Sequence, residues 1–394
     1  MSTQHDAHVL IIGGGGTGGA LAHDLSLRGL RVTLVERGEL TSGTTGRHHG
    51  MLHSGARYSV GDHESAVECI EENMILRRIC PGSLELNDGL FIAVEDEDLE
   101  YLEPLLEGCE ASGIPAQQLT PRQALALEPN LNPQLKAAVR IPDGSMDAMR
   151  LALRFFATAQ HNGAHIRPFT EVEGLLVHDH LVSGAVVRDH ATGTEDEIRA
   201  DLVVNATGPW SEKIAAMAGV DVPIRPSPGV LLALRGRLCN MVINRMHKSG
   251  DGDIILPQRA LSVVGTSSWV VEDPDDLPVP ADHVARMYSE GAKLIPAVAH
   301  SEQRAAWSAA RPLVGSRGEA DSGRELSRTF KTFDHKETDG MEGFVTITGG
   351  KGTTLRGMAE LCSDVVCRKL DIDEPCRTRD TVLLDHAAYY AAAA

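Results

Sequence analysis

One segment rich in glycine and hydroxyl groups, residues 41–58, carries side chains suited to acid–base chemistry. Histidine titrates near neutral pH, so His49 and His53 are candidates for a general base. The hydroxyl groups and backbone of the segment could hold phosphate oxygens, and its arginines could face an anionic substrate. The alternative is that both histidines only pack or form local hydrogen bonds.

A second chemical signal lies near the start of the chain. Gly13, Gly15 and Gly18 form the pattern G-x-G-x-x-G between an apolar run at residues 8–12 and a predicted helix. Because glycine has no Cβ, the backbone can approach a pyrophosphate, whose charge then lies at the helix N-terminus. The next predicted strand ends at Glu36, where a carboxylate can accept hydrogen bonds from ribose hydroxyls. This acid disfavours a 2′-phosphate, so the pattern predicts FAD or NAD rather than NADP.

Two further turns of small residues follow predicted strands much later in the chain. One is Asn-Ala-Thr-Gly at residues 205–208, and the other is Gly-Gly-Lys-Gly-Thr-Thr at residues 349–354. A cofactor that three such turns contact must be long, which favours FAD over NAD. A flavin at the last turn would have its N1/C2=O edge facing backbone N–H groups, which would stabilise the anionic reduced ring. The alternative for this turn is a purely structural connection between strand and helix.

Composition limits the class of protein and its partners. The chain has 394 residues, of which 42% are hydrophobic and 23% charged, as expected for one or two globular domains. No run approaches 18 apolar residues, and residues 1–8 lack the apolar core of a signal peptide. The net charge of −18 argues against nucleic acid as a partner and requires a local basic cluster for any anionic substrate. Seven cysteines without a C-x-x-C pair predict reduced thiols in the cytoplasm and no metal site.

The rest of the chain indicates two interleaved domains. Residues 145–165 predict an amphipathic helix, and residues 175–204 a β-meander. The acidic, proline-rich residues 270–280 predict a surface loop. A last strand over residues 343–348 is expected to lead into a helix that ends near Leu370.

The sequence resembles the flavin-bearing subunits of anaerobic glycerol-3-phosphate dehydrogenases, within the D-amino-acid-oxidase-like flavoproteins. The resemblance covers nearly the whole chain. It rests on the segments GGGGTGGALAHDLSLRGLRVTLVERG, TSGTTGRHHGMLHSGARYSV, IPDGSMDAMRL, NATGPW, ARPLVGS and ITGGKGTTLRGMAE, in the order of that family.

The resemblance implies an α/β fold in which a Rossmann-like FAD-binding domain is interleaved with a β-rich α+β substrate (cap) domain. The expected FAD-binding domain comprises residues 1–80, 145–220 and 340–386. The expected cap comprises residues 81–144 and 221–339. Residues 387–394 are expected to form a tail without a role.

The resemblance also implies site residues. Arg57, Tyr58, Arg311 and Lys351 match positions near the substrate and the flavin, and Arg328 matches a further basic position. Arg311 and Lys351 thus join His53 and His49 in the predicted catalytic group. Several convergent cations suit a dianionic phosphate. The predicted cofactor contacts are Gly13, Gly15, Gly18, Glu36, Arg37, Ser42, Thr45, Arg47, His48, Val172, Thr207, Gly208, Gly350, Lys351, Gly352 and Thr353.

The implied reaction is oxidation of sn-glycerol 3-phosphate at C2 to dihydroxyacetone phosphate, with the hydride passing to flavin N5. His53 is the favoured base, and the electrons are expected to pass to a quinone or a partner subunit. Some relatives attach FAD through a histidine that corresponds to Arg47 here, so we expect non-covalent FAD. The family also suggests contact with the membrane surface, although no basic amphipathic helix stands out.

Two alternatives stay open. One is a related FAD enzyme that oxidises another 2-hydroxy acid or polyol phosphate, such as 2-hydroxyglutarate. The other is a flavin-binding subunit that only relays electrons.

Overall fold

The first glycine turn lies at the edge of a mainly parallel six-stranded sheet. The computed structural model describes residues 4–315 and 329–392. The strand order is β19 (Phe330–Asp334), β20 (Phe344–Gly349), β13 (Leu202–Asn205), β1 (His8–Ile12), β2 (Arg31–Val35) and β9 (His165–Arg167). Neighbouring strands are parallel except for the antiparallel pair β19 and β20. Strands β1 and β13 are fully buried, as continuous apolar runs require.

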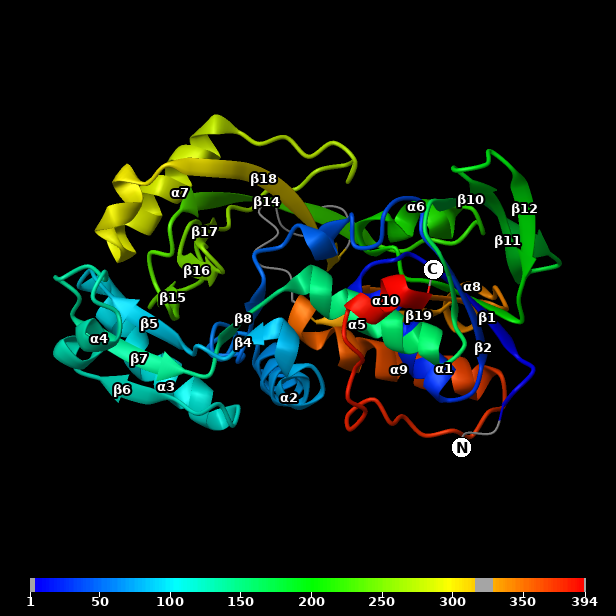
Figure 1. Ribbon diagram of the computed structural model, residues 1–394, viewed down its shortest axis with the longest axis horizontal. Helices are drawn as coiled ribbons and strands as arrows, with labels where there is room; N and C mark the ends of the chain where they lie inside the picture. The colour runs from blue at the N-terminus through cyan, green and yellow to red at the C-terminus, as the bar shows by residue number, and fades with distance from the viewer. Residues whose placement is uncertain (1–3, 316–328, 393–394) are drawn as a thin grey trace.

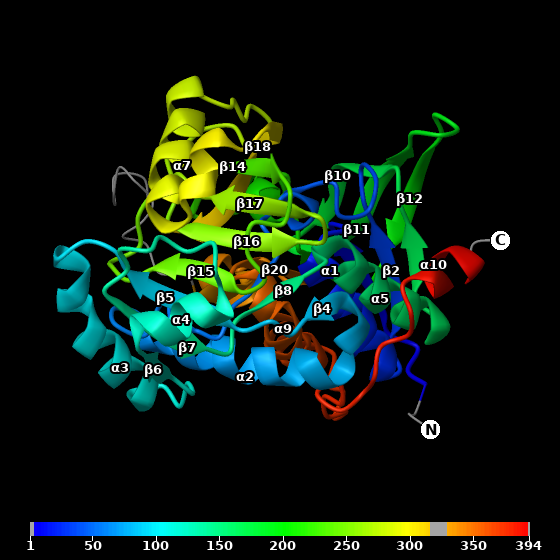
Figure 2. The same cartoon turned by 60° about the vertical axis from the view of Figure 1, so that its left-hand side comes forward.

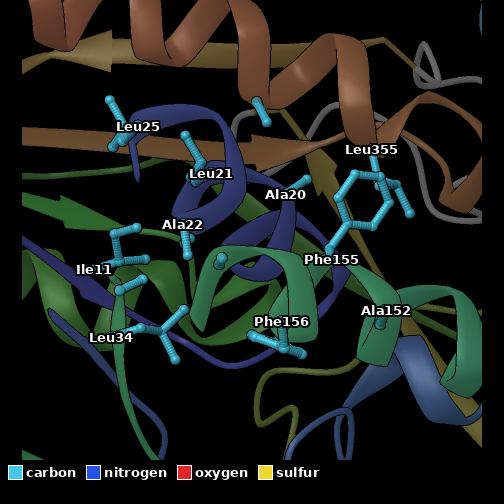
Figure 3. Packing of buried hydrophobic residues seen from close by; sticks show 14 of the residues in the cluster. Ile11, Ala20, Leu21, Ala22, Leu25, Leu34, Ala152, Phe155, Phe156 and Leu355 are labelled. Carbon is cyan, nitrogen blue, oxygen red and sulfur yellow. The ribbon is translucent and has the colours of Figure 1, made fainter. Parts of the chain in front are cut away.

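Three helices pack in the main core of this part. They are α1 (Gly16–Leu27), α5 (Ala148–His161) and α9 (Leu355–Lys369). Figure 3 shows Leu21 of α1, Phe155 of α5 and Leu355 of α9 among the side chains that fill the space between these elements. Gly19 allows the close packing of α1 on α5, because a Cβ there would lie 3.0 Å from the ring of Phe156.

The second large sheet is mainly antiparallel. Its order is β18 (Gln303–Val314), β14 (Ile224–Arg235), β17 (Leu261–Gly265), β16 (Ile254–Gln258), β15 (Val242–Arg245), β5 (Gly89–Ala93), β7 (Ala137–Ile141) and β6 (Gln117–Leu119). Only β15 and β5 are a parallel pair among these strands of the described chain. Helix α7 (Ala281–Leu294) packs on this sheet through Met287 and Leu294. In both views the second sheet lies to one side of the first (Figures 1 and 2).

Smaller elements complete the fold. A three-stranded sheet between the two large ones contains β3 (Met51–Leu52), β8 (Gly144–Met146) and β4 (Leu84–Glu85). The remaining α-helices of the described residues are α2 (His63–Ile79), α3 (Leu102–Ala111), α4 (Pro121–Leu127), α6 (Ser211–Ala216), α8 (His335–Asp339) and α10 (Ala387–Ala392). No helix in the described ranges is long and apolar enough to cross a membrane.

The structure corrects three details of the sequence prediction. The helix expected over residues 145–165 begins only at Ala148, because residues 144–146 pair as strand β8 and Asp147 caps the helix by accepting from the Arg150 amide. The meander consists of β10 (Thr170–His178), β11 (Leu181–Asp189) and β12 (Glu195–Arg199), whereas residues 202–205 join the parallel sheet as β13. Residues 387–392 of the expected tail form α10, whose Tyr389 is buried and packs on Phe156.

The two large sheets draw their strands in turn from separated segments of the chain, as two interleaved domains would. The domain boundaries stay a prediction. Strand β19 pairs in the first sheet although it precedes residue 340, where the last FAD-binding segment was expected to begin.

His23 on α1 is a buried polar group that should make the fold sensitive to acid. Its side chain is 0% exposed, lies 5.7 Å from the ring of Phe155 and has no hydrogen-bond partner for either nitrogen among the described residues. Burial lowers its pKa from 6.5 to about 4. Between these values the unfolded chain binds more protons than the folded one, so stability falls as the pH falls.

We therefore expect His23→Leu to be more stable than the wild type, with a gap in unfolding free energy that widens by about 2 kcal/mol from pH 7 to pH 5. Urea unfolding at the two pH values measures this. His178→Leu changes a side chain that is 87% exposed, and its unfolding free energy should change between the two pH values by as much as that of the wild type. A constant gap between His23→Leu and the wild type would contradict the assignment.

Candidate cofactor and active site

The three glycine turns predicted from the sequence line one cavity. This cavity has a volume of about 410 Å³ and lies where β1, β13 and β20 end. Its walls include residues 13–16, 206–209 and 347–352. The carboxyl ends of parallel strands meet at one edge of a sheet, which is where open α/β sheets bind their ligands. One long cofactor bound in this cavity could therefore contact all three turns, as the sequence predicts.

Most of the predicted cofactor residues line this cavity. They are Gly13, Gly15, Glu36, Arg37, Ser42, Thr45, Arg47, His48, Val172, Thr207, Gly208, Gly350, Lys351 and Gly352. Gly18 and Thr353 do not line it. A Cβ on Gly18 would lie 1.9 Å from the carbonyl oxygen of Gly13. Gly18 therefore allows helix α1 to pack directly against the end of strand β1. Thr353 is buried, and its hydroxyl accepts from the His53 amide at 3.0 Å.

The first turn has the features that a dinucleotide needs. Gly13 has a φ of +113°, and a Cβ there would lie 2.7 Å from the carbonyl oxygen of Ala206. Helix α1 begins at the cavity, where its first amide, that of Gly16, donates to the Thr45 hydroxyl at 3.0 Å, and the positive end of its dipole suits an anion. The carboxylate of Glu36 accepts from the amides of Gly14 at 2.7 Å and Gly38 at 2.9 Å. Since a carboxylate has about four acceptor positions, Glu36 can hold the turn and still accept from a ribose.

The loop of residues 270–280 reaches the same cavity. As predicted, it forms no helix or strand, and its Asp275 lines the cavity wall. Asp275 accepts from Arg37 at 2.7 Å, Lys213 at 2.8 Å and the indole nitrogen of Trp210 at 2.8 Å. Partial burial alone would raise the pKa of Asp275, but these donors lower it to about 2. Sequence reasoning missed this contact, because its members lie far apart along the chain and form no local motif.

The predicted catalytic residues gather beside the last turn. The ring centres of His49 and His53 are 6.0 Å apart, and those of His53 and Tyr58 are 5.4 Å apart. The Lys351 ammonium lies 5.0 Å from the centre of the Tyr58 ring and 3.6 Å from Glu68. Two histidines, a phenol and an ammonium therefore lie close together, with His53 buried and His49 and Tyr58 half-buried.

Two arginines bring further positive charge to this region. Burial lowers the pKa of His49 well below 6.5, and the neighbouring charges of His53 and His48 lower it further. The charges of Arg311 and Arg57 also lower the pKa of His49. Arg328, the fifth predicted basic or aromatic substrate contact, lies outside the described residues.

Asp253 holds the Arg57 side chain in place. The two side chains are 8% and 2% exposed, and one terminal nitrogen of Arg57 donates to the Asp253 carboxylate. The other terminal nitrogen, Nη1, has no partner among the described residues. Arg311 is held differently, through donation to the Thr266 hydroxyl and to the Ser227 carbonyl oxygen at 3.2 Å.

A comparison with protein families decides the class of the chain. A model of FAD dependent oxidoreductases, abbreviated DAO, matches residues 8–361. The chain belongs to this family. This match confirms the resemblance to D-amino-acid-oxidase-like flavoproteins that the sequence motifs indicate. It also confirms the predicted α/β fold and FAD as the cofactor.

Two curated relatives show how far the likeness extends. The chain is 45% identical over 382 residues to an anaerobic glycerol-3-phosphate dehydrogenase subunit of Escherichia coli (strain K12), covering 96% of this chain and 70% of that protein. It is 44% identical over 386 residues to an anaerobic glycerol-3-phosphate dehydrogenase subunit of Haloferax volcanii, and this match covers 95% of this chain and 66% of that protein. Among solved structures, glycerol-3-phosphate dehydrogenase from Bacillus halodurans complexed with FAD has a similar fold. Its TM-score is 0.70 at 23% identity, over 96% of this chain and 68% of that one.

The contact at Gly18 predicts a sharp effect on flavin binding. In Gly18→Ala the new methyl group would overlap the Gly13 carbonyl, so the turn must move. We expect this variant to be purified with less than a tenth of the wild-type flavin, as measured by the ratio of flavin to protein absorbance. Gly61→Ala is the control, since nothing lies within 4 Å of a Cβ there. Full flavin content in Gly18→Ala would show that the close approach is not needed.

Proposed function

We propose that this chain uses FAD to oxidise the secondary alcohol of sn-glycerol 3-phosphate, giving dihydroxyacetone phosphate. One observation carries the proposal: the rings of His49, His53 and Tyr58 lie together beside the Lys351 ammonium of the last glycine turn, and the charges of Arg57 and Arg311 act on His49. A site that joins a base to several cations suits an alcohol that carries a phosphate. The identity of 45% to a glycerol-3-phosphate dehydrogenase subunit supports the same substrate.

FAD, when bound, supplies the hydride acceptor for this reaction. The residues of the chain have three tasks: to bind the phosphate, to accept the hydroxyl proton and to orient C2. We place the flavin end of the cofactor at the last turn, where Gly350 lines the cavity. Close packing fixes this turn, because the Cβ of any larger residue at Gly350 would lie 2.4 Å from the Met358 sulfur. Gly352 packs in the same way against the ring of His48.

The hydrogen bonds of His49 and His48 argue against either of these two rings as the base. The Met51 amide donates to Nδ1 of His49 at 3.0 Å, as the Gly50 amide does to Nδ1 of His48 at 2.9 Å. A backbone N–H can only donate, so Nδ1 of each ring is an acceptor and the neutral ring carries its proton on Nε2. To accept another proton, His49 or His48 must give up this bond. We therefore assign proton removal to His53.

Arg57 and Arg311 are the proposed phosphate ligands. Because Asp253 occupies one edge of Arg57, the Nη1 group is left for the substrate. These local cations attract a dianion, although the overall charge of −18 would repel it.

Each turnover must pass two electrons on to an acceptor. The relatives named as subunits imply assemblies with other subunits, and we propose a partner subunit or a quinone as the acceptor. We further propose that FAD is held without a covalent bond and that the protein works in the cytoplasm, with contact to the membrane surface. All seven cysteines are free thiols, and six of them are buried, which suits a reducing compartment.

Anaerobic titration of the purified yellow protein tests this function. Glycerol 3-phosphate should bleach the flavin absorbance near 450 nm with about one equivalent per flavin, because each oxidation delivers two electrons. If 2-hydroxyglutarate bleached the flavin and glycerol 3-phosphate did not, the substrate would be a 2-hydroxy acid and the proposal would be wrong. Bleaching by neither would favour a subunit that only relays electrons.

Arg57 gives a test of phosphate binding. Lysine keeps the charge but cannot bond the Asp253 carboxylate and a phosphate with two separate edges. We expect Arg57→Lys to raise KM for glycerol 3-phosphate at least tenfold while flavin content is unchanged. Arg235→Lys, at a side chain that is 71% exposed, is the matched control. An unchanged KM in Arg57→Lys would remove Arg57 from the phosphate site.

A further inference from the structure

The peptide bond that follows His53 is held at both ends by buried side chains. The Asn73 amide group donates to the His53 carbonyl oxygen at 3.0 Å, and the Ser54 amide donates to the Asp143 carboxylate at 2.7 Å. The His53 amide donates to the Thr353 hydroxyl at 3.0 Å. Asn73, Asp143 and Thr353 are 0%, 2% and 0% exposed. Three side chains from distant parts of the sequence therefore fix the backbone on both sides of one residue.

Further bonds fix the orientation of Asn73. The Arg77 guanidinium donates to its Oδ1 at 2.6 Å, so the Nδ2 group must face the other way. There it also donates to the Pro142 carbonyl oxygen at 3.2 Å. Asn73 thus joins helix α2 to the two segments that contain His53 and Asp143.

Asp143 connects the same peptide to the second sheet. Its other oxygen accepts from the Asn244 amide group on strand β15 at 3.2 Å. Burial raises the pKa of Asp143 to about 6, although the Ser54 and Asn244 donors lower it. Keeping such a carboxylate in the interior costs free energy, which points to a role beyond filling space.

We propose that Asn73 and Asp143 are positioning residues that set the direction in which His53 presents its ring to the substrate hydroxyl. This inference rests on the proposed function, in which His53 removes the proton. A base must lie within hydrogen-bond reach of its proton, and a displacement of about 1 Å can cost about 100-fold in rate. The bonds from Asn73, Asp143 and Thr353 act on the backbone and not on the imidazole ring, so they orient His53 without using the group that accepts the proton.

Two substitutions that hardly change the shape of the side chain can distinguish a positioning role from a role in packing alone. Asn73→Asp keeps the acceptor for Arg77 but replaces the donor by an oxygen that repels the His53 carbonyl. Asp143→Asn can still accept from the Ser54 amide. Its new NH₂ group can donate to Oδ1 of Asn244, which has no partner among the described residues, once the Asn244 amide turns over. Asp143→Ala removes the acceptor entirely.

The experiment is anaerobic rapid mixing of each flavin-loaded variant with glycerol 3-phosphate, which gives the limiting rate of flavin reduction and the apparent Kd separately. Asn73→Asp and Asp143→Ala should lower the limiting rate by 10- to 100-fold and leave Kd within threefold of the wild type. Asp143→Asn should restore the rate to within threefold. Glu71→Gln, at an exposed position on the same helix, is the control.

Each other outcome has a defined meaning. Wild-type rates in both Asn73→Asp and Asp143→Ala, with loss of rate in His53→Gln, would overturn the positioning role and leave the proposed function intact. A rate in Asp143→Asn as low as in Asp143→Ala would overturn the role of Asp143 as an acceptor. If Asn73→Asp lost flavin or melted early, the two Asp143 variants would decide. Failure of glycerol 3-phosphate to reduce the wild type would instead refute the proposed function.

Discussion

The close approach of helix α1 to the end of strand β1 is the contact on which the rest of the site depends. Gly18 lies against the Gly13 carbonyl, where a single methyl group would not fit. This contact sets α1 at the end of the parallel sheet, so that the helix N-terminus faces the cavity. The Glu36 carboxylate holds the same turn from the neighbouring strand through the Gly14 amide. Only with this turn in place do the other two strand ends complete a cavity for a long cofactor.

The second sheet holds the segment of residues 41–58 against this cavity. Gln258 donates to the His49 carbonyl oxygen at 2.9 Å, and the Trp307 indole donates to that of Arg47 at 2.6 Å. The Thr44 hydroxyl donates to the Ala310 carbonyl oxygen at 2.7 Å. The proposed reacting side chains therefore lie on a loop, but two side chains and one backbone carbonyl of strands in the second sheet hold this loop in place. Such support is what a site requires when its geometry must be kept within a fraction of an ångström.

Local patterns allowed the sequence to predict the cofactor half of the molecule. The glycine turns, the strands at residues 8–12 and 31–35, and the helix after residue 354 each depend on neighbours in the chain, so composition and spacing reveal them. Asp253 and Asp143 could not be found in this way. Their partners Arg57 and Ser54 are 196 and 89 residues away, and only the folded chain brings them together. The late start of helix α5 has the same cause, because strand β8 forms through distant pairing.

In the proposed function, the cofactor occupies the cavity that Asp275 and residues 349–352 line, with its flavin end at residues 349–352 and the substrate next to His53. A crystal structure of the flavin-loaded protein with dihydroxyacetone phosphate tests this arrangement most directly. We expect the flavin ring against residues 349–352 and the phosphate within hydrogen-bond distance of Arg57 and Arg311. A flavin ring beside Asp275, or a phosphate bound away from both arginines, would contradict it.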